Sequence, residues 1–197
     1  VRAHILGYNY IGVSHIEKIG AETLRKRTEN GYRYIEVLNK IGYRADLKEI
    51  EKLTTSAIYK QHILAYLMKT GQTDEIFGDV YYKEFKNGGP CSFDVEYPDA
   101  VACVRAICAD GGIAVLAHPG QQNNFALLPK LVEAGLKGIE YNHPSHHEEH
   151  RRKVREEAEK FGLFMTGGSD FHGLYEKTKT TLGAYPAHES SRVLFEK

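Results

Sequence analysis

Histidine and aspartate residues that could bind a metal ion stand at the ends of short apolar runs. His118 follows the run 112–117, and Asp170 and His172 follow the run 162–166. In an extended chain, side chains two residues apart point the same way, so Asp170 and His172 could face one ion. Imidazole nitrogen together with carboxylate oxygen suits zinc, manganese or iron. The pattern predicts a metal site, and the alternative is a polar strand end with an incidental aspartate.

The remaining candidates depend on that pair. His118 alone could equally be a hydrogen-bonded core residue, but beside Asp170 and His172 we interpret it as a ligand. His143 and His146 lie before or within the first turn of a charged helical segment, where they could donate hydrogen bonds to a phosphate or carry a proton. Glu140 could be either a ligand or a salt-bridge partner.

The elements that position these residues alternate between strand and helix. Apolar runs begin at residues 112, 138 and 162, and helical patterns cover 98–110, 127–134 and 145–161. Repeated strand–helix units predict an α/β fold with a parallel sheet, either open or closed into a barrel. Loops at the carboxyl ends of parallel strands converge, so the candidate residues should meet there. A further strand, 3–7, begins beside His4.

The N-terminal half carries helical patterns and no clear strand between residues 14 and 95. The clearest helix is predicted over 57–68, and Asn-Gly-Gly-Pro at 87–90 breaks the pattern before the strand–helix repeats begin. We therefore expect residues 20–95 to form a helical insertion subdomain, with 1–19 and 96–197 forming the main domain.

Composition excludes several classes of function. The 197 residues are 42% hydrophobic and 26% charged with a formal net charge of zero, so no global field attracts nucleic acid or membranes. No apolar run reaches the roughly 18 residues that span a bilayer. Three cysteines without metal-type spacing indicate reduced thiols and a cytoplasmic protein. No membrane association and no protein partner is predicted.

Four segments together resemble a known family. HILGY (4–8), GGIAVLAHPG (111–120), GIEYNHPSHHEE (138–149) and TGGSDFHG (166–173) are similar to the later motifs of PHP-domain (polymerase and histidinol phosphatase) phosphoesterases. The resemblance covers nearly the whole chain. It is strongest to the bacterial branch that hydrolyses nucleoside 3′,5′-bisphosphates and RNA 5′ ends.

The resemblance implies a distorted (β/α)7-type barrel with a cluster of divalent metals (Mn, Zn or Fe). It places His4, His118, Asp170 and His172 at metal-ligand positions. It also makes Lys60 and His62 candidates for phosphate contact, although the family branch usually has arginine where Lys60 stands. A lysine keeps the positive charge but lacks the two-pronged guanidinium fork, and the alternative is an exposed pair on an ordinary helix.

One departure from the family is large. The family begins with an HxH strand, further ligands and a glutamate that bridges two metals, and all of these should precede His4. None is present here. We therefore expect the N-terminal barrel strands to be missing, the chain to be a fragment, and its own activity to be low.

The expected activity is hydrolysis of phosphate esters of a nucleotide or short nucleic acid by metal-activated water. His118, Asp170 and His172 would hold metal, while His143 or His146 would protonate the leaving oxygen. An amidohydrolase that acts on C–N bonds is the first alternative, which the paired Asp170 and His172 disfavour. A non-catalytic binding domain of the same fold is the second.

Overall fold

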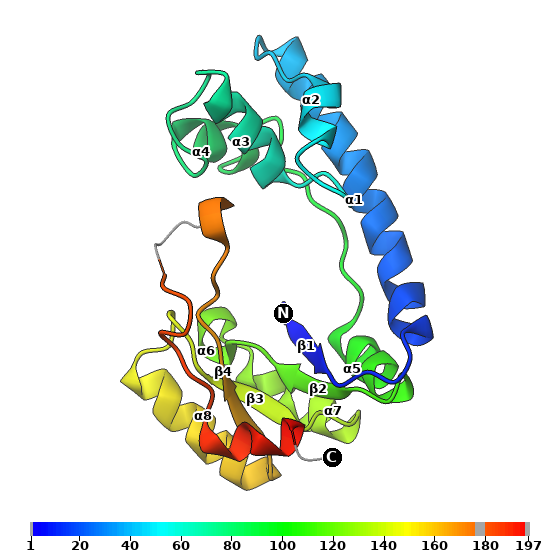
Figure 1. The fold of residues 1–197 in the computed structure, drawn as a ribbon, viewed down its shortest axis with the longest axis vertical. Helices are drawn as coiled ribbons and strands as arrows, with labels where there is room; N and C mark the ends of the chain where they lie inside the picture. Colours follow the sequence, from blue (N-terminus) through cyan, green and yellow to red (C-terminus); the bar gives the residue numbers. More distant parts are fainter. Residues whose placement is uncertain (1, 176–179, 196–197) are drawn as a thin grey trace. The chain divides into compact units, whose positions relative to one another are not determined.

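The computed structural model describes residues 2–175 and 180–195 (Figure 1). The chain divides into two compact units, one of Val1–Ile19 with Pro98–Lys197 and one of Gly20–Tyr97.

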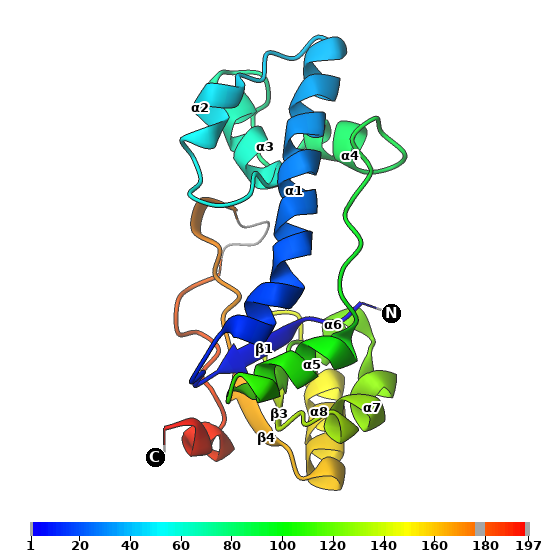
Figure 2. The ribbon, with the colours of Figure 1, turned by 90° about the vertical axis from the view of Figure 1, so that its right-hand side faces the viewer.

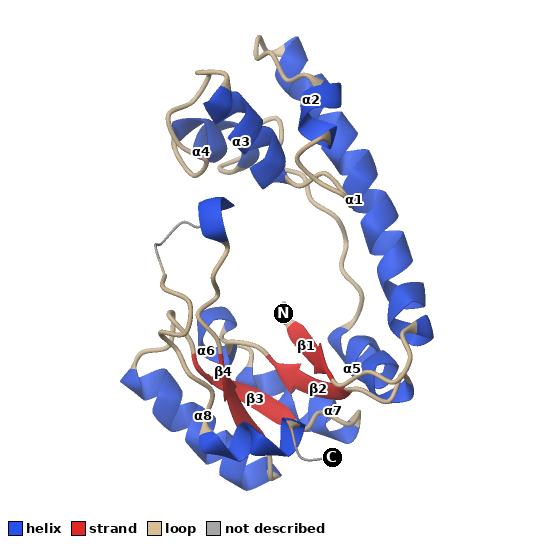
Figure 3. Cartoon of the chain, in the orientation of Figure 1, coloured by secondary structure: helices blue, strands red, loops and turns tan. Residues whose placement is uncertain are grey.

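A four-stranded sheet organises the first unit (Figure 3). Its order is β1 (Ile5–Tyr8), β2 (Ile113–Leu116), β3 (Gly138–Asn142) and β4 (Phe164–Gly167). Strands β2, β3 and β4 are mutually parallel, which confirms the predicted α/β class and the parallel strand–helix repeats. Strand β1 runs antiparallel to β2, with Ile5 opposite Leu116. The sequence did not predict this direction.

Helices cover one face of the sheet and bury the apolar side of each strand (Figure 2). They are α5 (Ala100–Ala109), α7 (Leu128–Glu133) and α8 (Glu148–Phe161). Leu116 of β2 and Ile139 of β3 lie fully buried in this core. Because alternate side chains of a strand point to opposite faces, Glu140 and Thr166 are left on the other face of the sheet.

Short elements complete the first unit. Helix α6 (Pro119–Gln122) follows β2 directly, and the 3₁₀ turns are η1 (Phe125–Leu127), η2 (Gly173–Tyr175) and η3 (Glu189–Leu194). The third predicted helix was placed too early, at residue 145, because α8 begins at Glu148. The helix is capped by His147, which pairs with His150.

The second unit is helical among its described residues. It contains most of α1 (Ser14–Lys40), together with α2 (Leu47–Glu51), α3 (Lys60–Lys69) and α4 (Asp79–Phe85). Its core includes fully buried Leu38, Ile50 and Leu64. Gly31 lies in the middle of α1, where a Cβ would come within 2.7 Å of the Ile58 Cβ, so this close approach requires glycine.

The predicted helix over 57–68 starts later than expected, at Lys60. Ala57 and Ile58 are buried in the turn before it, and Tyr59 has an extended backbone that caps the helix. Apolar residues that pack a turn into the core thus extended the helical pattern beyond the helix. No helix within the described ranges is long and apolar enough to cross a membrane.

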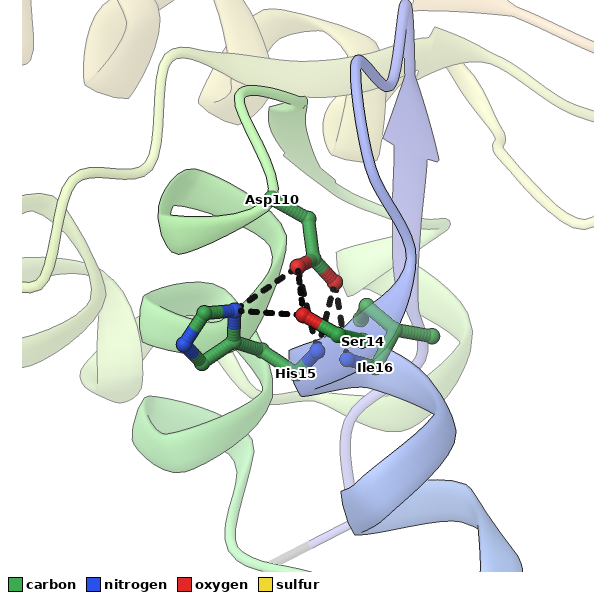
Figure 4. A network of polar contacts seen from close by, with 4 residues as sticks. All are labelled: Ser14, His15, Ile16 and Asp110. Carbon is green, nitrogen blue, oxygen red and sulfur yellow. Dashed lines mark hydrogen bonds and ion pairs between the residues drawn. The ribbon is translucent and has the colours of Figure 1, made fainter.

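A buried carboxylate fixes the start of α1 within the first unit (Figure 4). Asp110, at the end of α5, accepts hydrogen bonds from the backbone amides of His15 (3.0 Å) and Ile16 (2.8 Å). Its Oδ1 also lies 2.7 Å from His15 Nδ1 and 3.4 Å from the Ser14 hydroxyl. The first amides of a helix have no partner inside the helix, so this carboxylate supplies one from a distant segment.

The capping carboxylate makes a prediction about acid stability. Burial alone would raise the pKa of Asp110, but the amides of His15 and Ile16 and the His15 ring outweigh it, so the pKa falls below its ordinary 3.8. A carboxyl group whose pKa is lowered by folding stabilises the protein above its unfolded pKa, and that stability is lost as pH falls through the folded value. Asp110→Asn should therefore unfold at lower denaturant concentration than the parent at pH 6, with the difference shrinking below about pH 4. Urea titrations at several pH values measure this, and a difference independent of pH would contradict it.

Candidate metal site

Three histidines and an aspartate meet at one edge of the sheet. His118, His143 and Asp170 follow β2, β3 and β4, so the parallel strands bring them to the same edge. His4 precedes β1, and the antiparallel direction of β1 places its beginning beside the end of β2. The Ala117 amide accordingly donates to the His4 carbonyl at 3.0 Å. His4 Nδ1 lies 3.0 Å from His118 Nε2.

His118 has the most constrained backbone of the group. It is buried, with φ of 26° and ψ of 58°, immediately before Pro119 opens α6. Asp170 is also in the left-handed region, with φ of 49°. Residues other than glycine rarely adopt this conformation, and where they do the surrounding structure has to hold them there. Glu140 stabilises this conformation of His118, because its Oε2 accepts a hydrogen bond from the His118 backbone amide at 2.8 Å.

His143 lies beside His118, with ring centroids 4.8 Å apart, and its hydrogen bonds define the position of its proton. Its Nδ1 accepts the backbone amide of Ser145 at 3.1 Å, and the Ser145 hydroxyl lies 2.7 Å from the same nitrogen. A neutral imidazole that accepts at Nδ1 carries its proton on Nε2. That Nε2 is buried, lacks a hydrogen-bond partner among the described residues, and lies 3.6 Å from Asp170 Oδ2.

The arrangement fits a divalent cation. One ligand atom each from His118, Glu140 and His143 lies within 4.8 Å of the others. His118 Nδ1 is buried and, within the described part of the chain, without a hydrogen-bond partner. Buried polar atoms are nearly always paired, so an orphaned ring nitrogen beside a carboxylate indicates a missing ligand. Because His143 carries its proton on Nε2, however, His118 and Glu140 are the better metal ligands of this set.

Burial sets the charges of the group. Burial, with the neighbouring imidazoles of His143 and His4, lowers the pKa of His118 to about 4. Burial likewise lowers the pKa values of His4 and His143. Burial raises the pKa of Glu140 to about 7, although the His118 amide opposes the shift. The imidazoles are therefore neutral at pH 7, which is the form that binds metal.

The other predicted residues lie in different surroundings. His146 is buried with both ring nitrogens engaged, since Nε2 accepts the Gly120 amide at 3.1 Å and Nδ1 lies 2.9 Å from the Tyr141 carbonyl. The His172 side chain is 58% exposed, and its Nδ1 lies 2.6 Å from the Asp170 carbonyl oxygen and 3.8 Å from Asp170 Oδ1. The catalytic role predicted for His146 and the ligand role predicted for His172 stay predictions.

Lys60 and His62 lie in the second unit, at the start of α3. Lys60 Nζ is 3.3 Å from the Phe93 carbonyl and 3.7 Å from Asp94. His62 Nδ1 accepts the Tyr59 amide at 3.2 Å, so its proton is on Nε2. These contacts hold both residues, and their predicted role in phosphate binding stays a prediction.

Sequence reasoning left Glu140 open and missed Ser145. The alternation in β3 gave a signal for Glu140, because a charged residue between apolar neighbours in a short strand points away from the helix-covered core. Ser145 gave none, since its role depends on the turn that follows β3.

Comparisons with known proteins find hydrolases of phosphate esters. No family model matches the chain. A phosphoribosyl 1,2-cyclic phosphate 1,2-diphosphodiesterase from Eggerthella lenta is 38% identical over 88% of this chain and 68% of that protein. A 3′,5′-nucleoside bisphosphate phosphatase from Chromobacterium violaceum is 30% identical over 58% of this chain and 42% of its own length. A 5′-3′ exoribonuclease from Haemophilus influenzae is 25% identical over 86% and 64%. The chain thus spans less than two thirds of the latter two relatives.

Two solved structures share the fold. A protein from Bifidobacterium adolescentis, assigned as a metal-dependent phosphoesterase, matches 99% of this chain and 71% of its own with a TM-score of 0.86 and 22% identity. An amidohydrolase from Chromobacterium violaceum matches 86% of this chain and 62% of its own with a TM-score of 0.71 and 23% identity. At such identities the likeness shows the fold alone.

The E. lenta relative supports more than a fold, because both the identity and the coverage are high. The predicted enzyme class is confirmed, since the curated relatives are all hydrolases of phosphate esters by name. With 38% identity to a protein of which it covers 68%, the chain belongs to the PHP-domain family of metal-dependent phosphoesterases.

Proposed function

We propose that this chain carries part of the active site of an enzyme that hydrolyses phosphate monoesters or diesters of nucleotides or short RNA. The convergence of His4, His118, His143 and Asp170 at one sheet edge is the observation that supports it. The names of three relatives supply the substrate class. The proposal includes a distorted (β/α)7-type barrel, with residues 20–95 as its insertion subdomain and a cytoplasmic location.

His4, His118, Asp170 and His172 are the proposed metal ligands, with Glu140 beside them. Manganese, zinc and iron all suit nitrogen and carboxylate donors. Such a cation, when bound, acts as a Lewis acid that activates water and neutralises charge on the phosphoryl oxygens. The chain's own contribution is to bury His4 and His118 in part, which lowers their pKa values and keeps their rings neutral for binding.

His143 is proposed to donate a hydrogen bond to the leaving oxygen. Its proton is on Nε2, on the side that faces Asp170, because Nδ1 is occupied by the Ser145 amide. As the water oxygen forms the new bond to phosphorus and the bond to the leaving oxygen breaks, the Nε2–H of the neutral His143 ring donates a hydrogen bond to that leaving oxygen and stabilises its developing charge, while the proton released by the water passes to the leaving oxygen through solvent. His146 is less suited to this role, because both of its ring nitrogens are held in hydrogen bonds.

Hydrolysis of C–N bonds is the second candidate activity, because one protein of the same fold is named as an amidohydrolase. Release of phosphate against release of ammonia from a mixed substrate panel separates the two. The phosphoesterase is favoured because the curated relatives with named substrates act on phosphate esters.

Removal of a metal ligand should abolish the reaction. In the full-length gene product, His118→Ala should lower kcat/KM for a nucleoside 3′,5′-bisphosphate by about 100-fold or more, since ligand loss disables the activated water. EDTA should do the same to the parent, and Mn²⁺ should restore only the parent. His147→Ser, which keeps a helix-capping group on an exposed residue, is the matched control. Phosphate release measures the effect, and an active His118→Ala enzyme would rule out this site.

A hydrogen-bond donor to the leaving oxygen matters most for a poor leaving group. His143→Ala should therefore lower kcat by about 100-fold for a nucleoside monophosphate, but by much less for a nitrophenyl phosphate, whose leaving oxygen needs little stabilisation. Mn²⁺ affinity should stay near that of the parent. An equal loss on both substrates, accompanied by weaker Mn²⁺ binding, would instead make His143 a ligand.

Lys60 is proposed to attract the substrate phosphate. Lys60→Ala should raise KM several-fold with little change in kcat, whereas Lys60→Arg should retain KM because it keeps the cation. Steady-state kinetics with a nucleoside bisphosphate measure both constants. A lower melting temperature with unchanged KM would show that Lys60 serves only its contacts with Phe93 and Asp94.

A further inference from the structure

A hydroxyl group inside the first unit lacks a partner. Thr166, on β4, is 3% exposed, and its Oγ1 is buried without a hydrogen bond among the described residues. Buried hydroxyls in folded proteins are nearly always hydrogen-bonded, because leaving one unpaired is unfavourable. A valine would fill the same strand position without that penalty. The hydroxyl therefore indicates a function for this side chain beyond packing.

The strand register places Thr166 beside Glu140. The two residues are direct neighbours across the parallel pair of β3 and β4, so their side chains leave the same face of the sheet. Neighbouring strands lie about 4.8 Å apart, which is within the combined reach of a hydroxyl and a carboxylate side chain. The register shifts just after this pair, between Glu140 and Asn142, and such irregularities often aim side chains at a site.

The two oxygens of Glu140 have different surroundings. Oε2 accepts the His118 amide at 2.8 Å. Oε1 lies toward the continuation of β4, only 3.0 Å from where a Cβ on Gly168 would be. The strand that carries Thr166 thus runs along the Oε1 side of the carboxylate, opposite the oxygen that His118 holds.

We propose that Thr166 is a positioning residue, whose hydroxyl donates to the Glu140 carboxylate when a divalent cation fills the site. The carboxylate is then held from two sides, by the His118 amide at one oxygen and by Thr166 at the other. This fixes its orientation beside the His118 ring. The inference rests on the proposed metal-dependent function, and it adds a residue that supports the metal site without touching substrate.

A matched pair of substitutions tests the proposal. In the full-length gene product, Thr166→Val removes the hydroxyl and keeps the branched shape, whereas Thr166→Ser keeps the hydroxyl and removes the methyl group. Isothermal titration with Mn²⁺ alone gives the affinity of each variant, and thermal unfolding without metal reports on packing. Partners that orient metal ligands typically contribute 10- to 100-fold to affinity, so Thr166→Val should weaken Mn²⁺ binding by about tenfold or more. Thr166→Ser should stay within about twofold of the parent, since it retains the donor.

The outcomes separate this role from the proposed function. Mn²⁺ binding by Thr166→Val that equals the parent's would overturn the positioning role alone. Equal losses in both variants would also overturn it, because the missing methyl group would then explain the effect. A parent that does not bind Mn²⁺ at all would overturn both the metal-dependent function and the inference that rests on it.

Discussion

The antiparallel pairing of β1 with β2 is the constraint on which the candidate site depends. A parallel β1 would carry His4 to the opposite edge of the sheet, away from the residues that follow β2, β3 and β4. Because β1 is reversed, the residue that enters it lies level with the residues that leave its neighbours, and the Ala117 amide bonds to the His4 carbonyl. Two imidazoles from residues 4 and 118 then approach to 3.0 Å. The buried Glu140 completes the arrangement by holding the backbone of His118 in a conformation that a histidine rarely adopts.

Proton positions divide the histidines of this region by role. A backbone amide reaches one nitrogen of His143 and one of His146, and each of these bonds decides where the remaining proton must be. His146 has no nitrogen left for chemistry, whereas His143 keeps an Nε2 proton that is directed at the site. Histidines that look equivalent in the segment HPSHHEEH thus differ in which ring nitrogens remain free to react, because backbone amides near the turn after β3 occupy the others. Side-chain counts alone could not separate them.

Much of the architecture could be predicted from local pattern. Apolar runs that begin with glycine gave β2, β3 and β4, and His118, Asp170 and His172 were predicted as candidate ligands because polar groups follow buried strands. The direction of β1 could not be predicted, because an isolated apolar run carries no information about its partner. The start of α8 was misplaced for a related reason. Ser145 has the residue type of a helix cap, yet its hydroxyl contacts the ring of His143 in the turn, and the cap passes to His147. Thr166 gave no signal at all, since threonine is ordinary in a strand and only the register places it beside Glu140.

The pairing of Ile5 with Leu116 has a consequence for folding during synthesis on the ribosome. Residues 20–97 are synthesised in full before β2 exists, so β1 must wait as an unpaired strand while the helical unit is completed. Contacts between residues this distant in sequence form slowly. Until they form, the unpaired edge of a strand can pair incorrectly with other strands or aggregate. The helical unit can fold around its own core during that interval. This shortens the flexible chain between β1 and β2 and so lowers the entropy cost of pairing them. The order of synthesis thus favours a nascent chain in which the helical unit folds first and the sheet edge with the candidate metal site assembles last.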